Sequence, residues 1–108
     1  MSDEIYVLKT KREIENISNL SSLTYSPHDG YLYATVNKPA QILRITKEGT
    51  INRVKDIPFI KDAESIEYLT DGVFLAADEE TSILYVISID ENMNVEVKSS
   101  MQLDVFNG

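Results

Sequence analysis

The chain has 108 residues, of which 43% are hydrophobic and 26% are charged, with a net charge of −8 and no cysteine. This composition is typical of one ordinary folded domain, and it excludes a disordered, fibrous or disulfide-stabilised protein. The acidity lies in the second half, because residues 61–108 carry eleven Asp or Glu against two Lys or Arg. Since such a surface repels phosphate groups, we expect no nucleic-acid partner.

The N-terminus and the hydrophobic runs bear on location. No hydrophobic run approaches the roughly 20 residues that a membrane-spanning helix needs. Residues 1–4 include two acidic side chains, unlike the positively charged start of a signal peptide. From these features we expect no membrane segment within this chain and, as it is written, a cytoplasmic protein.

Short runs rich in Val, Ile, Leu and Tyr follow one another from the N-terminus, and each has the length of a β-strand and is followed by turn residues. The expected strands are residues 5–8, 20–25, 31–36, 41–46, 50–54, 65–69, 73–77, 82–89 and 94–97. Asp71 and Gly72 mark a two-residue hairpin, because a type I′ turn needs positive φ at both central positions. The sequence therefore predicts an all-β fold.

The segments recur at an interval of 42 or 43 residues. Residues 22–25 align with 65–68, residues 30–34 with 72–76, and residues 42–46 with 84–88. Four short strands in such a period are typical of a propeller blade. We therefore predict β-propeller-type, four-stranded antiparallel blades in two units, residues 16–60 and 61–108, after an N-terminal strand-like segment at residues 1–15.

Both units contain motifs of a known family. In the first unit these are residues 19–27, 31–35 and 37–42, and in the second unit residues 62–69, 71–74 and 78–79. Together they resemble the SdiA-regulated (YjiK-like) family of β-propeller proteins. Residues 62–68 are similar to the family's Asp-x-Glu-Gly-Ile-x-Tyr segment, with Ser65 in place of the glycine. The resemblance implies a propeller fold and longer relatives that are commonly exported, but it implies no defined reaction.

Four carboxylates are expected at one end of the second unit. In an antiparallel blade, the loop into the first strand and the loop from the second to the third strand lie at the same end. The carboxylates that this places together are Asp62, Glu64, Asp78 and Glu79. Ca²⁺ takes several oxygen ligands, so these four residues are candidate ligands for Ca²⁺. The other interpretation is an acidic rim that holds no ion and keeps the protein soluble.

Two functions follow from these features. The first is a binding or scaffold module that docks a cation, a small ligand or a protein at the acidic end. The alternative is a metal-dependent esterase-like or phosphatase-like hydrolase that uses the rim carboxylates, by analogy of fold. The only histidine, His28, falls in a turn at the opposite end, so a Ser-His-carboxylate arrangement cannot form within the chain. We therefore expect no catalytic residue and no cofactor besides Ca²⁺, which favours the module.

Two blades do not close a propeller, which needs about four to eight of them. Each open flank would expose a hydrophobic sheet face. We therefore expect either self-association, most simply into a trimer, or completion by the remainder of a longer propeller. Contact between the two units is expected through Leu23, Leu32, Ile45, Ile66, Phe74, Leu84 and Ile87.

Overall fold

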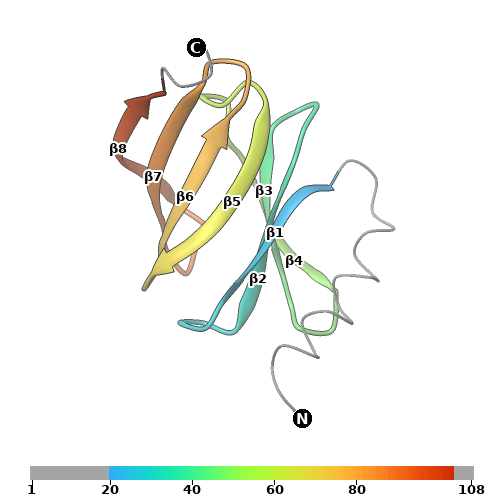
Figure 1. Ribbon diagram of the computed structural model, residues 1–108. Helices are drawn as coiled ribbons and strands as arrows, with labels where there is room; N and C mark the ends of the chain where they lie inside the picture. Colours follow the sequence, from blue (N-terminus) through green and yellow to red (C-terminus); the bar gives the residue numbers. More distant parts are fainter. Residues whose placement is uncertain (1–19, 104–108) are drawn as a thin grey trace.

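A computed structural model describes residues 20–103, and within this range the chain forms strands and turns without a helix (Figure 1). The strands are β1 (Leu20–Ser26), β2 (Tyr31–Val36), β3 (Gln41–Ile45), β4 (Ile51–Asp56), β5 (Ala63–Thr70), β6 (Val73–Asp78), β7 (Ile83–Ile89) and β8 (Val95–Gln102). Nothing in residues 20–103 is a helix long and apolar enough to cross a membrane.

The strands form two antiparallel sheets, each a meander of neighbours in sequence. The first sheet has the order β1-β2-β3-β4, and the second sheet has the order β5-β6-β7-β8. Hairpin turns join the strands, and Gly72 shows why glycine is needed at one of them. Its φ is +71°, and an added Cβ would lie 3.4 Å from the carbonyl oxygen of Ile89. The predicted all-β fold of four-stranded antiparallel blades is confirmed.

Most strand positions agree with the sequence pattern, and β8 is the main difference. This strand continues to Gln102, although its hydrophobic pattern ends at Val97. Ser99 and Met101 pair with Val86 and Leu84 of β7, and the backbone ladder holds them there whatever their polarity. The expected strand at residues 5–8 and the segment 1–15 lie outside the described residues. The predicted boundary at residues 60 and 61 falls in the loop between β4 and β5.

The two sheets pack against each other through a shared core. Phe74 and Ile66 of the second sheet meet Tyr33 and Ile42 of the first sheet, and all four are buried. The rings of Tyr33 and Phe74 lie 4.6 Å apart between centroids. A second cluster of buried side chains lies on the other face of the first sheet, and its members are Leu32, Ala34, Val36, Leu43 and Ile45.

The expected contact between the units was partly wrong. Ile66, Phe74 and Ile87 belong to the shared core as predicted. Leu32 and Ile45 instead lie in the second cluster with Leu23 packed against it, and Leu84 lies on the far face of the second sheet. The reason is that stacked blades meet through opposite faces of their sheets. Residues at equivalent positions of the two repeats point to the same face of each sheet, so they cannot contact each other across the junction.

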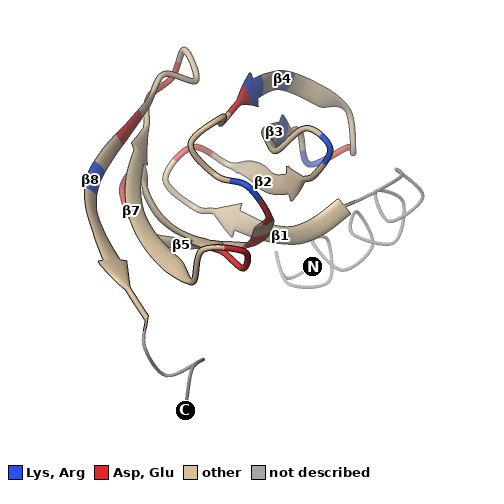
Figure 2. Cartoon of the chain, turned by 90° about the horizontal axis from the view of Figure 1, so that it is seen from above, with Lys and Arg blue, Asp and Glu red and all other residues tan. Residues whose placement is uncertain are grey.

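The inner strands β1 and β5 lie side by side, and β4 and β8 lie at the periphery (Figure 2). The inner strands are joined through side chains. The Ser22 hydroxyl accepts the N–H of Ile66 at 3.1 Å and donates to its carbonyl at 3.3 Å. The Thr24 hydroxyl accepts the N–H of Tyr68 at 3.1 Å. These bonds satisfy the backbone edge of β5 and fix the two sheets relative to each other.

Candidate functional site

Three of the four predicted carboxylates come together beside β5. Asp62 precedes β5, Glu64 lies on it, and Glu79 directly follows β6. One carboxylate oxygen from each lies within 4.8 Å of the others. The backbone brings the two loops together, because the N–H of Glu79 donates to the carbonyl of Asp62 at 2.9 Å. We call these three residues the acidic corner.

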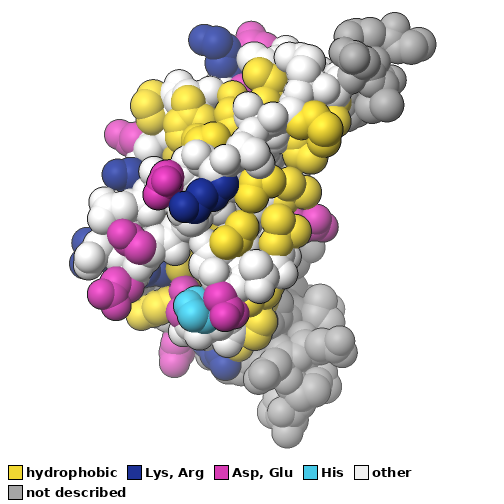
Figure 3. Space-filling view, turned by 90° about the vertical axis from the view of Figure 1, so that its left-hand side faces the viewer, with side chains coloured by type: hydrophobic (Ala, Val, Ile, Leu, Met, Phe, Trp, Pro, Cys, Tyr) yellow, Lys and Arg dark blue, Asp and Glu magenta, His cyan; other side chains and the backbone are white. Residues whose placement is uncertain are grey.

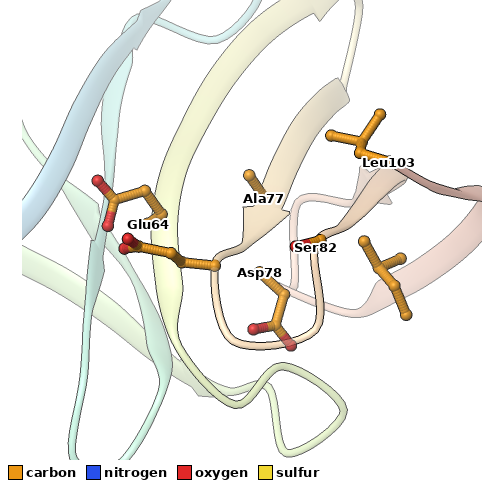
Figure 4. Close-up of a pocket in the computed structure, with 7 residues that line it drawn as sticks. Glu64, Ala77, Asp78, Ser82 and Leu103 are labelled. Carbon is orange, nitrogen blue, oxygen red and sulfur yellow. The ribbon is translucent and has the colours of Figure 1, made fainter. Parts of the chain in front are cut away.

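Asp78, the fourth predicted residue, has a different role in the structure. Its side chain is 1% exposed, and Figure 4 shows it pointing away from Glu64. Its carboxylate accepts the backbone N–H groups of Lys61 at 2.9 Å, Asp62 at 3.1 Å and Glu80 at 3.1 Å. Burial alone would raise the pKa of Asp78, but the N–H groups of Lys61 and Asp62 lower it below its ordinary value of 3.8. Asp78 thus fixes the loops that carry the acidic corner.

Asn37 connects the acidic corner to the first sheet. Its amide nitrogen donates to Asp62 Oδ1 at 2.9 Å and to the carbonyl of Ala63 at 3.2 Å. Its amide oxygen accepts the N–H of Ala63 at 2.7 Å. The sequence suggested no role for Asn37. The only signal in the sequence was its position directly after the second strand of its unit, at the end of the blade where the loop into the next unit is expected.

Glu64 and Glu79 interact directly with each other within the acidic corner. The hydrogen bond between them and the negative charge of Glu64 raise the pKa of Glu79. A raised pKa means that the second negative charge is unfavourable beside the first. A cation or a hydrogen-bond donor that entered the corner would relieve this repulsion.

Two hollows border the corner, and Glu79 lines both. The first has a volume of about 390 Å³, and Ala77, Ile83 and Leu103 form its apolar wall beside Glu64 (Figure 4). The second has a volume of about 400 Å³ and includes Lys38 and Lys61. The negative charge of the acidic corner is therefore partly neutralised by Lys38 and Lys61 on one side. On the other side, the corner adjoins an apolar wall.

His28 lies at the opposite end of the blades, as expected. Its Nδ1 is 3.5 Å from Asp71 Oδ1, and both side chains are exposed. The turn at Asp90 is also at this end, where Asp90 accepts the N–H groups of Asn92 at 2.8 Å and Asn94 at 2.9 Å. The arrangement therefore places no imidazole near the acidic corner, and residues 20–103 offer no Ser-His-carboxylate geometry.

One comparison with known proteins bears on this fold and site. A family model described as SdiA-regulated matches residues 2–107. The match covers nearly the whole chain and confirms the resemblance seen in the sequence motifs. The chain therefore belongs to the SdiA-regulated family.

Proposed function

We propose that this chain is a binding and scaffold module of the β-propeller type, and that its acidic corner binds Ca²⁺. The observation that carries the proposal is the approach of Asp62, Glu64 and Glu79 to within 4.8 Å of one another. Carboxylate oxygens are the ligands that Ca²⁺ prefers, and flexible sites accept six to eight of them. Backbone carbonyls and water would complete the shell. Asp78 supports the site, because its carboxylate is engaged by backbone N–H groups.

The electrostatics of the corner favour a cation. Glu79 has a raised pKa because of Glu64, so a divalent ion that bound both groups would replace repulsion with attraction. Lys38 and Lys61 line the neighbouring hollow and reduce the net negative charge there. We therefore expect an affinity in the range of extracellular Ca²⁺ modules, about 10⁻⁴–10⁻³ M.

The test is calorimetry and thermal unfolding with Ca²⁺ or chelator. At 10 mM Ca²⁺, such an affinity stabilises the folded state by about 1.4–2.7 kcal/mol. For a domain of this size, that raises the unfolding midpoint by at least about 5 °C. The double variant Glu64→Gln/Glu79→Gln should lose the shift.

The matched control is Glu48→Gln/Glu91→Gln, which removes the same charge from exposed turns at the opposite end. This control should keep the calcium response. A midpoint that ignores Ca²⁺ in the unaltered chain, with no heat of binding, would contradict the cation site. Ester or phosphate hydrolysis that is lost in Glu64→Gln would contradict the function as a binding module and support the alternative function as a hydrolase.

A further inference from the structure

The two sheets carry the same dipeptide in equivalent turns. Asp29 and Gly30 lie between β1 and β2, and Asp71 and Gly72 lie between β5 and β6. Both glycines have positive φ, +80° for Gly30 and +71° for Gly72. Because the dipeptide is the same in both turns, a difference in its chemistry must come from the surrounding structure.

An aspartate that precedes glycine can react with the backbone of its own turn. The glycine nitrogen, after losing its proton to solvent, attacks Cγ of the protonated side-chain carboxyl group. An N–Cγ bond forms, the Cγ–OH bond breaks, and the hydroxyl leaves with a solvent proton as water, which closes a succinimide ring. Glycine favours this step because it has no Cβ to obstruct the approach.

Hydrolysis of the ring completes the reaction. Water adds to the main-chain carbonyl carbon of the aspartate and breaks the bond from that carbon to the glycine nitrogen. The product is isoaspartate, whose backbone runs through Cβ and Cγ and whose main-chain carboxylate is free. The water lost in the first step is regained in the second, and no oxidant, reductant or cofactor takes part.

In the first sheet, hydrogen bonds hold both reacting groups. Asp29 Oδ1 accepts the N–H of Tyr31 at 3.0 Å, and Asp29 Oδ2 accepts the hydroxyl of Tyr33 at 2.6 Å. Tyr33 is buried in the shared core, so its hydroxyl is fixed in position. The N–H of Gly30 donates to the carbonyl of Ser26 at 2.8 Å. The Asp29 carboxyl group can therefore reach the nitrogen of Gly30 only after these bonds break.

In the second sheet, the same groups are held weakly. Asp71 Oδ1 lies 3.4 Å from the hydroxyl of Tyr68 and 3.5 Å from Nδ1 of His28, which are long contacts. Within residues 20–103, neither Asp71 Oδ2 nor the N–H of Gly72 has a hydrogen-bond partner. The Asp71 side chain is 79% exposed, and Figure 3 shows the single histidine at the surface beside acidic side chains. The carboxyl group and the nitrogen are therefore free to approach each other.

We propose that Asp71 is a modification site, at which aspartate isomerises to isoaspartate in the folded protein, and that the fold protects Asp29 from the same reaction. Hydrogen bonding carries this difference, since both aspartates are exposed to solvent. The site lies at the opposite end of the blades from the acidic corner. The proposal is therefore independent of Ca²⁺ binding.

The modification would lengthen the hairpin between β5 and β6. The added backbone atom falls in a two-residue loop, and the residues on either side of this loop, Thr70 and Val73, pair with each other. Loop length sets the register of a hairpin. The carbonyl of Gly72 also accepts the N–H of Ile89 at 2.8 Å. Isoaspartate at position 71 should weaken this bond, so we expect faster hydrogen exchange at the Ile89 amide.

The rates at the two turns can be compared in one sample of the unaltered chain. The folded protein is incubated in mildly acidic buffer, and electron-transfer fragmentation of its peptides distinguishes isoaspartate from aspartate at each position. We expect isomerisation at position 71 to be at least about tenfold faster than at position 29, because the hydrogen bonds of the Asp29 carboxylate must first break. In urea that unfolds the chain, the two rates should become similar.

Tyr33→Phe tests the protection directly. It removes the hydroxyl that binds Asp29 Oδ2 and keeps the ring in the core. Isomerisation at position 29 should become at least about fivefold faster, as expected for the loss of one hydrogen bond, while position 71 keeps its rate. The matched control is Tyr68→Phe, which removes the hydroxyl near Asp71 and should change neither rate.

Equal rates at positions 29 and 71 in the folded chain would overturn the proposal. It would also be overturned if the folded chain formed isoaspartate at neither position while the unfolded chain formed it at both. An unchanged rate at position 29 in Tyr33→Phe would overturn hydrogen bonding as the cause of the protection. Unchanged exchange at the Ile89 amide in the isomerised protein would overturn the effect on the hairpin.

Discussion

Asp78 shows how one side chain can look like a ligand and serve as a scaffold. Its carboxylate lies between two loops that are distant in sequence, and it accepts three backbone N–H groups. An ionised acceptor is well suited to this role, because hydrogen bonds to a charged group are stronger than neutral ones. The order of the acidic corner therefore depends on a residue that does not belong to it.

We expect Asp78→Asn to lower the free energy of unfolding by about 1–3 kcal/mol at neutral pH, because the amide group cannot accept all three N–H groups. Chemical unfolding followed by circular dichroism measures this loss. An unchanged stability would show that the three hydrogen bonds do not hold the loops.

The same residue predicts a dependence on pH. The pKa of Asp78 is lowered in the folded state, so its contribution is present above the unfolded pKa and is lost as the pH falls through the folded pKa. The stability difference between the unaltered chain and Asp78→Asn should therefore shrink as the pH falls below about 4. A difference that stays constant down to about pH 2 would contradict this assignment.

At the scale of elements, β1 and β5 meet in a way that ends each sheet. Hydroxyls of Ser22 and Thr24 bind the backbone of β5, so the two inner strands do not join into one continuous sheet. An unpaired strand edge invites pairing with another chain. The short hydroxyl side chains therefore satisfy this edge and allow the sheets to stack.

Thr24→Val removes one of these acceptors while keeping the side chain's shape. The N–H of Tyr68 then loses its partner, and we expect a destabilisation of about 1–3 kcal/mol and faster hydrogen exchange at this amide. Thr70→Val, at an exposed position on β5, the strand that carries Tyr68, is the control and should change little. Unchanged exchange at Tyr68 in Thr24→Val would mean that the hydroxyl does not bind this edge.

At the scale of the whole molecule, one core joins the two sheets. Phe74 is fully buried between Tyr33 and Tyr68, with ring centroids 4.6 Å and 5.8 Å away. Met93, from the turn before β8, closes the same core. Because residues of both sheets share this core, neither sheet keeps its burial without the other.

Phe74→Ala should therefore destabilise both sheets together, by about 3–5 kcal/mol. Thermal unfolding monitored by near-ultraviolet and far-ultraviolet circular dichroism should show a single transition at a lower midpoint for both signals. Val54→Ala, on the exposed strand β4, is the control and should have little effect. Two separate transitions in Phe74→Ala would show that the sheets unfold independently.

The sequence by itself determined the all-β class, most strand positions, the blade-type meander and the family. These features are encoded locally, because alternation of side chains and turn residues such as Gly72 depend on neighbours along the chain. The same logic placed Asp62, Glu64 and Glu79 at one end of the second sheet. The polar end of β8 carried no such signal, because only pairing with β7 holds it in the sheet.

Only the tertiary structure decided which faces meet and what each polar side chain does. Leu32 and Phe74 follow the same strand pattern, yet they lie in different clusters because stacked sheets use opposite faces. Asp78 and Glu79 are adjacent, yet one is 1% exposed and the other is open to solvent. Side-chain alternation sets which face of a strand each residue occupies, but the neighbouring loops that supply or withhold N–H donors come from other parts of the chain.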